Sequence, residues 1–71
     1  MSPEFNEDLL RIARQARGWS QTELSKRSGV SQANLSKLEN GLIGPTEDVL
    51  TSVSATLGFP VEFFFQNDRV I

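Results

Sequence analysis

The chain contains neither cysteine nor histidine. Without cysteine it has no disulfide and no reactive thiol. Without either residue the usual zinc sites are excluded, and so is acid–base catalysis by an imidazole. The sequence shows no nucleophile–base pair and no glycine-rich phosphate loop. It therefore argues against an enzyme and predicts no metal or cofactor.

Long apolar runs are also missing. No stretch approaches the roughly 18 apolar residues that a membrane-spanning helix needs, and no basic and apolar leader opens the chain. We therefore expect a protein of the cytoplasm. Seventy-one residues suffice for one domain with a modest core, so residues 1–71 are expected to form a single domain.

The periodicity of the chain is helical. Strand-like alternation of apolar and polar residues is scarce, whereas helical spacing recurs five times between short breaks. The sequence thus predicts an all-α fold, with helices at about 5–17, 21–28, 32–39, 47–57 and 61–66. In the first helix, one apolar face is expected from Phe5, Leu9, Ile12, Ala13 and Ala16.

Charge is distributed unevenly along the chain. The formal net charge is −2, but the stretch from Leu9 to Lys37 carries +5 and the stretch from Leu42 to Ile71 carries −3. Because local potential governs association, a basic first half is compatible with a nucleic-acid partner. This signal is weak alone, since most charge clusters are simply solvated faces.

Two short helices are expected on either side of a tight turn. Ser20 and Glu23 form the pattern of a capping box, in which the serine hydroxyl takes a backbone N–H and the carboxylate reaches back. Gly29 is placed to end this helix, and Ser31 to begin the next. Two short helices joined by a glycine-bearing turn are typical of a helix-turn-helix.

The helix after this turn has a polar outer face. At 100° per residue, Leu35 and Leu38 point to the core, with Asn34 and Glu39 near its edges. The outward residues are Gln32, Ala33, Ser36, Lys37 and Asn40. Such side chains can bond base edges or phosphates, and alanine can contact a thymine methyl group. The alternative is an ordinary solvated face, which any soluble helix presents.

The segments "GWSQTELSKRSGVSQANLSKLENG" and "LTSVSATLGFPVEFFF" resemble the Cro/repressor-type, or XRE, helix-turn-helix family. The resemblance implies a compact five-helix bundle of the lambda-repressor-like type, with the third helix in the major groove. It also implies sequence-specific binding of double-stranded DNA by a bacterial or phage-type transcriptional regulator. We expect a homodimer on a palindromic operator, located in the cytoplasm at the nucleoid.

The resemblance assigns roles to individual residues. It implies base contacts by Gln32, Ala33, Ser36 and Lys37. It implies phosphate contacts by Gln21 and Asn40, with Gln21 also bracing the start of the third helix. Arg14 and Glu39 match a partly buried ion pair between the first and third helices. On this hypothesis Arg11, Lys26 and Arg27, together with Lys37, attract phosphates non-specifically.

The aromatic run near the end of the chain departs from the family pattern. Phe63, Phe64 and Phe65 cannot all be buried by one short helix, so we interpret Phe63 and Phe64 as a dimer or interdomain surface. The simpler interpretation leaves two of the three in the core. An alternative function follows, namely a protein–protein adaptor or antitoxin-like module that works through this helix. The end at Ile71 raises a further hypothesis, that a C-terminal effector domain is absent from this chain.

Overall fold

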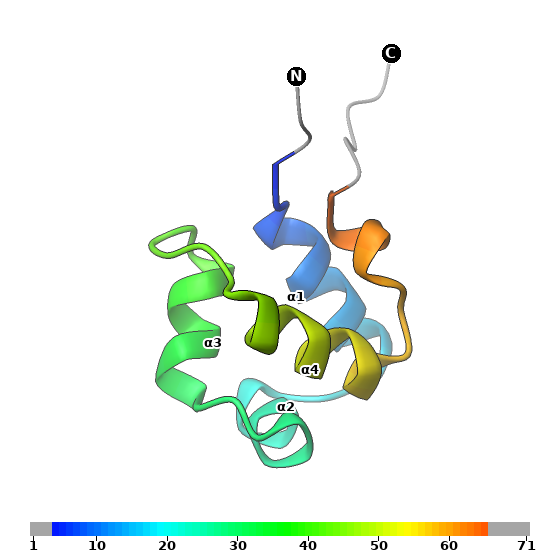
Figure 1. Cartoon of the computed structure of the whole chain (residues 1–71). Coiled ribbons are helices and arrows are strands. Elements are labelled where there is room, and N and C mark those ends of the chain that lie inside the picture. Colours follow the sequence, from blue (N-terminus) through cyan, green and yellow to red (C-terminus); the bar gives the residue numbers. More distant parts are fainter. Residues whose placement is uncertain (1–3, 66–71) are drawn as a thin grey trace.

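The computed structural model describes residues 4–65, and every regular element in that range is helical. The elements are α1 (Glu7–Ala16), α2 (Gln21–Ser28), α3 (Gln32–Glu39), α4 (Glu47–Leu57) and the 3₁₀ helix η1 (Val61–Phe65) (Figure 1). The predicted all-α class is confirmed, although the fifth helix is a short 3₁₀ turn and α1 is shorter at both ends than predicted. No helix within residues 4–65 is long and apolar enough to span a bilayer.

Each α-helix begins at a polar capping residue whose side chain accepts a backbone N–H. The caps are Asn6, Ser20, Ser31 and Thr46, with donor–acceptor distances of 2.9, 3.1, 3.2 and 3.2 Å. These bonds satisfy donors that the first helical turn leaves free. The second half of the predicted capping box is wrong, because the Glu23 carboxylate accepts from Arg27 Nε at 2.7 Å, one turn further along α2.

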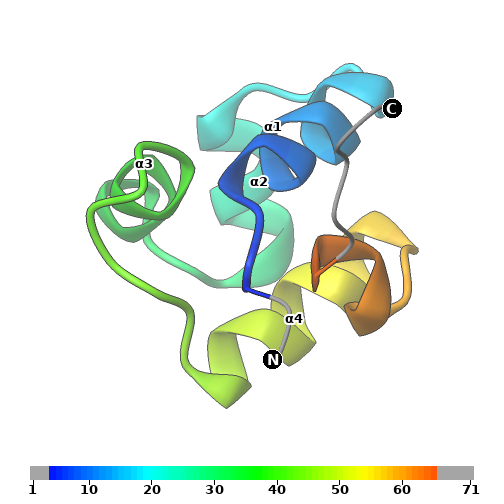
Figure 2. The same ribbon diagram turned by 90° about the horizontal axis from the view of Figure 1, so that it is seen from above.

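A single apolar core joins all five elements. It consists of Leu9, Leu10, Ala13, Leu24, Val30, Leu35, Leu38, Val53, Leu57 and Phe64. Within it, α1 lies between α3 and η1 (Figure 2). Packing on both flanks centres the buried arc of α1 on Leu9, Leu10 and Ala13. The prediction that Ile12 faces the core is therefore wrong, and this side chain is 51% exposed.

The aromatic run is packed inward. Phe64 is fully buried, and its carbonyl oxygen accepts the backbone N–H of Asn6 at 2.7 Å, so η1 holds the chain just before α1. Phe63 is half-buried, with its ring centroid 4.7 Å from that of Phe59 and 5.2 Å from that of Phe64. The prediction of Phe64 as an interface residue is wrong, because η1 directs this ring into the space beside α1. Phe63 and Phe65 keep part of their surface exposed.

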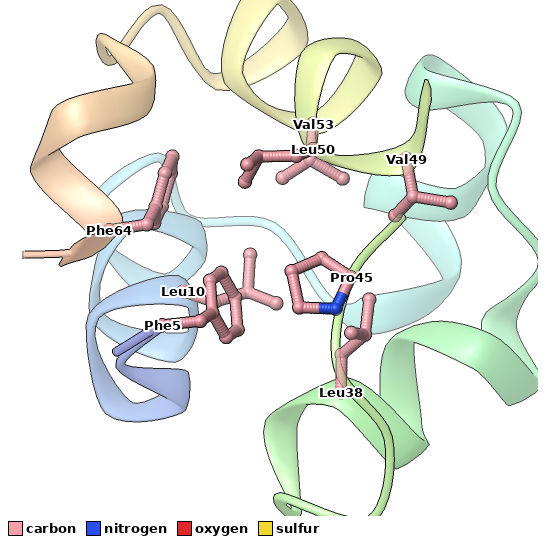
Figure 3. A pocket seen from close by; sticks show the side chains of 8 residues that line it. All are labelled: Phe5, Leu10, Leu38, Pro45, Val49, Leu50, Val53 and Phe64. Atoms are coloured by element: carbon pink, nitrogen blue, oxygen red, sulfur yellow. The ribbon is translucent and has the colours of Figure 1, made fainter. Parts of the chain in front are cut away.

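A small apolar cavity remains between α1, α3, α4 and η1 (Figure 3). Its volume is about 10 Å³, which is close to the minimum for one water molecule. The lining includes the buried residues Leu10, Leu38 and Phe64 together with half-buried Phe5 and Val49. Because the lining is apolar and the volume is small, this cavity is a packing gap rather than a ligand site.

The two neighbouring phenylalanines give a direct test of this packing. Phe64→Ala should lower the free energy of unfolding by about 3–5 kcal/mol, since it removes a fully buried ring from the core. Phe63→Ala, the matched control, should cost less than half as much because its ring is only half-buried. Urea unfolding followed by circular dichroism measures both. Equal losses would contradict the inward placement of Phe64.

Candidate nucleic-acid interface

Helices α2 and α3 are joined by a turn of three residues, Gly29 to Ser31. Gly29 has φ of +81°, in the left-handed region that a residue with a side chain rarely adopts. Val30 follows, and its side chain is buried in the core, so it holds the turn against the body of the domain. With Ser31 capping α3, this short connection fixes the direction of α3 relative to α2. The arrangement is that of a helix-turn-helix.

The outer face of α3 presents polar side chains to solvent. Four of the five predicted outward residues are exposed, namely Gln32, Ala33, Lys37 and Asn40. The fifth, Ser36, is half-buried and its hydroxyl accepts a bond from Asn40 Nδ2 at 3.4 Å. That is the only side-chain bond this set makes within residues 4–65. Almost all of its hydrogen-bonding capacity therefore remains available to an external partner.

The opposite face of α3 is held by apolar contacts and one carboxylate. Leu35 and Leu38 are buried in the core, and Glu39 is only 2% exposed. The structure brings Arg14 of α1 to this carboxylate, with Nε at 2.7 Å from Oε2 and Nη2 at 2.9 Å from Oε1. The hydrogen bonds of such a bidentate, charge-assisted ion pair are short and directional. Arg14 also donates from Nη1 to the Trp19 carbonyl oxygen at 2.9 Å.

Two further side chains converge on Glu39. Gln21 Nε2 donates to its Oε1 at 3.1 Å, and Arg11 Nη2 donates to its backbone carbonyl at 2.8 Å. Gln21 was expected to brace the start of α3, but this contact joins it to the end of that helix. The role of Arg11 was not predicted, although its position one turn before Arg14 on the same face of α1 was a usable signal.

Burial alone would raise the pKa of the Glu39 carboxyl, but donors reverse that effect. Hydrogen bonds from Arg14 and Gln21, with the charges of Arg14 and Arg11, bring its pKa below the ordinary value. The bond to Glu39 in turn raises the pKa of Arg14, against the opposing effect of burial. At neutral pH the pair is therefore ionised, and it ties α1 to α3 while Gln21 adds α2.

The basic residues of the described region differ in what they contact. Arg11 lies 3.2 Å from Asp8, and Arg27 bonds Glu23 at 2.7 Å with its guanidinium 4.4 Å from the centre of the Trp19 ring. Lys26 and Lys37 are exposed, and their ammonium groups form no ion pair or hydrogen bond within residues 4–65. Lys37 is also the basic residue on the outer face of α3.

Comparison with known proteins supports the same arrangement. The helix-turn-helix family model HTH_3 matches residues 10–64. The HTH-type transcriptional regulator SlrR of Bacillus subtilis is 42% identical over 64 residues, which are 89% of this chain and 42% of the regulator. The antitoxin HipB of Escherichia coli K12 is 37% identical over 51 residues, which are 72% of this chain and 54% of the antitoxin.

Solved structures resemble the fold closely. An HTH_3 family transcriptional regulator from Vibrio cholerae superposes with a TM-score of 0.79 at 32% identity, over 87% of this chain and 35% of that one. The N-terminal DNA-binding domain of the biofilm regulator SinR from Bacillus subtilis gives 0.77 at 28% identity, over 89% and 93%. Against its curated relatives, the matched part spans between 26% and 54% of their length.

The carboxylate of Glu39 should make the free energy of unfolding depend on pH in the acidic range. The pKa of this carboxyl in the folded state lies below the ordinary value of 4.5. The ionised carboxylate therefore contributes fully to the free energy of unfolding above about pH 4.5, and the contribution is lost as the pH falls through the lower folded-state pKa. Glu39→Gln should cost about 3 kcal/mol at pH 7, since it leaves Arg14 without its charged partner. The difference from the parent chain should shrink below pH 4.

Urea midpoints measured from pH 7 to about pH 2.5 test this expectation. Glu62→Gln is the matched control, because Glu62 is an exposed carboxylate on η1 with no ion pair within residues 4–65. Its curve should run parallel to that of the parent chain. A Glu39→Gln curve that also stays parallel would contradict a stabilising, ionised Glu39.

Proposed function

Because this chain belongs to the helix-turn-helix family HTH_3, we propose that it binds double-stranded DNA sequence-specifically as part of a transcriptional regulator. In this proposal α3 enters the major groove, and α2 crosses the sugar–phosphate backbone. The names of the relatives SlrR and SinR, a transcriptional regulator and a regulator with a DNA-binding domain, support this assignment and argue against an enzyme.

One observation carries the proposal most strongly. The outer face of α3 presents hydrogen-bonding side chains that the protein itself leaves almost unused, while three donors from α1 and α2 fix the opposite face through Glu39. A helix that is rigidly held and polar on its free side can present base-reading groups in a constant geometry. This combination is what a recognition helix needs.

We divide the proposed contacts into base readout and phosphate positioning. Base edges are read by Gln32, Ala33, Ser36 and Lys37, with alanine contributing a methyl contact at most. Phosphates are bound by Gln21 and Asn40, with Lys26 adding attraction. Gln21 suits this double role, because its amide has two hydrogens and the bond to Glu39 uses only one.

Arg11 and Arg27 also belong to the proposed phosphate contacts, but their partners within the protein weaken that role. The guanidinium of Arg11 is already shared between Asp8 and Glu39, and that of Arg27 between Glu23 and the Trp19 ring. A phosphate must compete with these groups. We therefore propose that Lys37, rather than either arginine, dominates the salt dependence of binding.

The proposed assembly is a two-fold homodimer on a palindromic operator. One short module presents a small interface, and two modules on half-sites about one helical turn apart gain affinity together. The partly exposed side of Phe63 is the proposed dimer or interdomain contact, now without Phe64. Since the chain spans only part of its curated relatives, the proposal includes a further effector region. It also includes a location at the nucleoid, where a DNA-binding protein would meet its partner.

The likeness to the antitoxin HipB supports a second candidate, an antitoxin-like module. The aromatic helix offers less surface for such a role than its sequence suggested, because Phe64 is fully buried. Selection of bound sequences from random duplex DNA separates the two candidates. A defined, two-fold symmetric motif supports the regulator, whereas no enrichment at low salt would overturn DNA reading and favour the antitoxin-like module.

Lys37 provides the sharpest single-residue test. Lys37→Ala should weaken binding to the selected motif and reduce the slope of log affinity against log salt by about 0.9, the effect of one phosphate contact. Should Lys37 instead bond a guanine, the variant also relaxes preference at that base pair, by about 1–3 kcal/mol. Fluorescence anisotropy over a salt series measures both effects.

Arg27→Gln is the matched control for that experiment, since Arg27 is also exposed and basic but is paired within α2. Its effect on the salt slope should be smaller than that of Lys37→Ala. If Lys37→Ala leaves both affinity and slope unchanged, the placement of α3 in the groove is wrong.

A further inference from the structure

The start of α1 packs against the end of α3 (Figures 1 and 2). Arg11 Nη2 donates to the backbone carbonyl of Glu39 at 2.8 Å. The Glu7 carboxylate lies against Gly41, where its Oε2 is 3.1 Å from the place that a Cβ would occupy. Between these two contacts lies Asn40, the C-cap of α3 and a proposed phosphate contact. The first turns of α1 therefore set the electrostatic surroundings of that residue.

The two acidic residues that open α1 differ in their partners. Asp8 is exposed, and its carboxylate lies 3.2 Å from the guanidinium of Arg11. Glu7 is half-buried, and its carboxylate forms no ion pair or hydrogen bond with any of residues 4–65. Both carboxylates suit the positive end of the α1 dipole, but that effect needs no contact with α3. The contact with Gly41 thus places an unpaired negative charge at the end of the proposed recognition helix.

A phosphate bonded to Asn40 would meet this charge at close range. The backbone N–H of Asn40 already bonds the Ser36 carbonyl at 3.0 Å, so the side-chain amide must make the contact. Because Asn40 and Gly41 are neighbours, with Cα atoms about 3.8 Å apart, we take the phosphate to lie about 8 Å from the Glu7 carboxylate. Repulsion between two unit charges at that distance in water lowers affinity about twofold.

We propose that Glu7 is a negative determinant of DNA binding. Its carboxylate repels the phosphate that Asn40 contacts, and so opposes the attraction from Lys37, which lies in the last turn of the same helix. This inference rests on the proposed DNA reading and adds to it a role for α1. Because phosphates carry no sequence information, Glu7 lowers affinity for every duplex alike and leaves the preferred motif unchanged.

The test uses the 71-residue chain and a duplex that carries the motif selected from random DNA. Fluorescence anisotropy measures affinity at about 10 mM salt, where the Debye length is about 30 Å. Glu7→Gln should tighten binding about twofold and Glu7→Lys about fourfold, since each step changes the charge by one unit in the same direction. Both gains should shrink at about 0.15 M salt, where the Debye length is about 8 Å.

Glu62→Gln and Glu62→Lys are the matched controls. Glu62 is an exposed carboxylate of η1, which packs on the other flank of α1 from α3. These variants change the net charge equally and should leave affinity unchanged. Damage to folding cannot imitate the expected result, because a less stable chain binds more weakly.

Each other outcome counts against the proposal. Equal gains from the Glu62 variants would reduce the effect to net charge and overturn the role of Glu7. Glu7 variants with unchanged or weaker binding to the selected motif would overturn that role while leaving DNA reading intact. If the parent chain selects no motif at all, DNA reading itself fails, and the role of Glu7 fails with it.

Discussion

The carboxylate of Glu39 is the contact on which the arrangement of this domain depends. It accepts two bonds from Arg14 and one from Gln21, while the carbonyl of the same residue accepts one from Arg11. Three helices therefore meet at one residue. Apolar packing alone would leave α3 free to rotate or slide by small amounts, since dispersion contacts have little directionality. Bonds to a single carboxylate with fixed geometry remove that freedom, which an apolar side chain of similar volume could not do.

This use of arginine changes how the charge of the chain should be understood. The stretch from Leu9 to Lys37 carries +5 by sequence, yet much of that charge serves the fold. Arg14 neutralises Glu39, and Arg17 donates to the Leu57 carbonyl at 2.8 Å, which satisfies the end of a helix that has no base in its own last turn. For the proposed DNA partner, fewer of these cationic side chains are therefore free to bond phosphates than the sequence suggests.

Local patterns predicted the elements well, because each helix has its own cap and terminator in the sequence. Ser20 and Ser31 were identifiable as caps before any tertiary information, and the outward face of α3 followed from its helical period. The buried face of α1 could not be predicted in this way, because the elements packed on both of its flanks decide which of its residues are covered. Ile12 is therefore exposed, whereas Leu10, which the predicted apolar face did not include, is buried. The inward direction of Phe64 likewise depends on where η1 meets the start of α1, and no local pattern encodes that meeting.

The division of α3 into two faces also has a consequence for how such a domain can change over time. Its fixed face consists of Leu35, Leu38 and Glu39 and carries the contacts to the rest of the described domain. Among residues 4–65, its free face makes only one weak side-chain bond. Substitutions on the free face should therefore change the proposed DNA contacts at little cost to folding. Duplicated copies of such a gene could diverge toward new target sequences by a few exposed changes, while the scaffold beneath them stays the same.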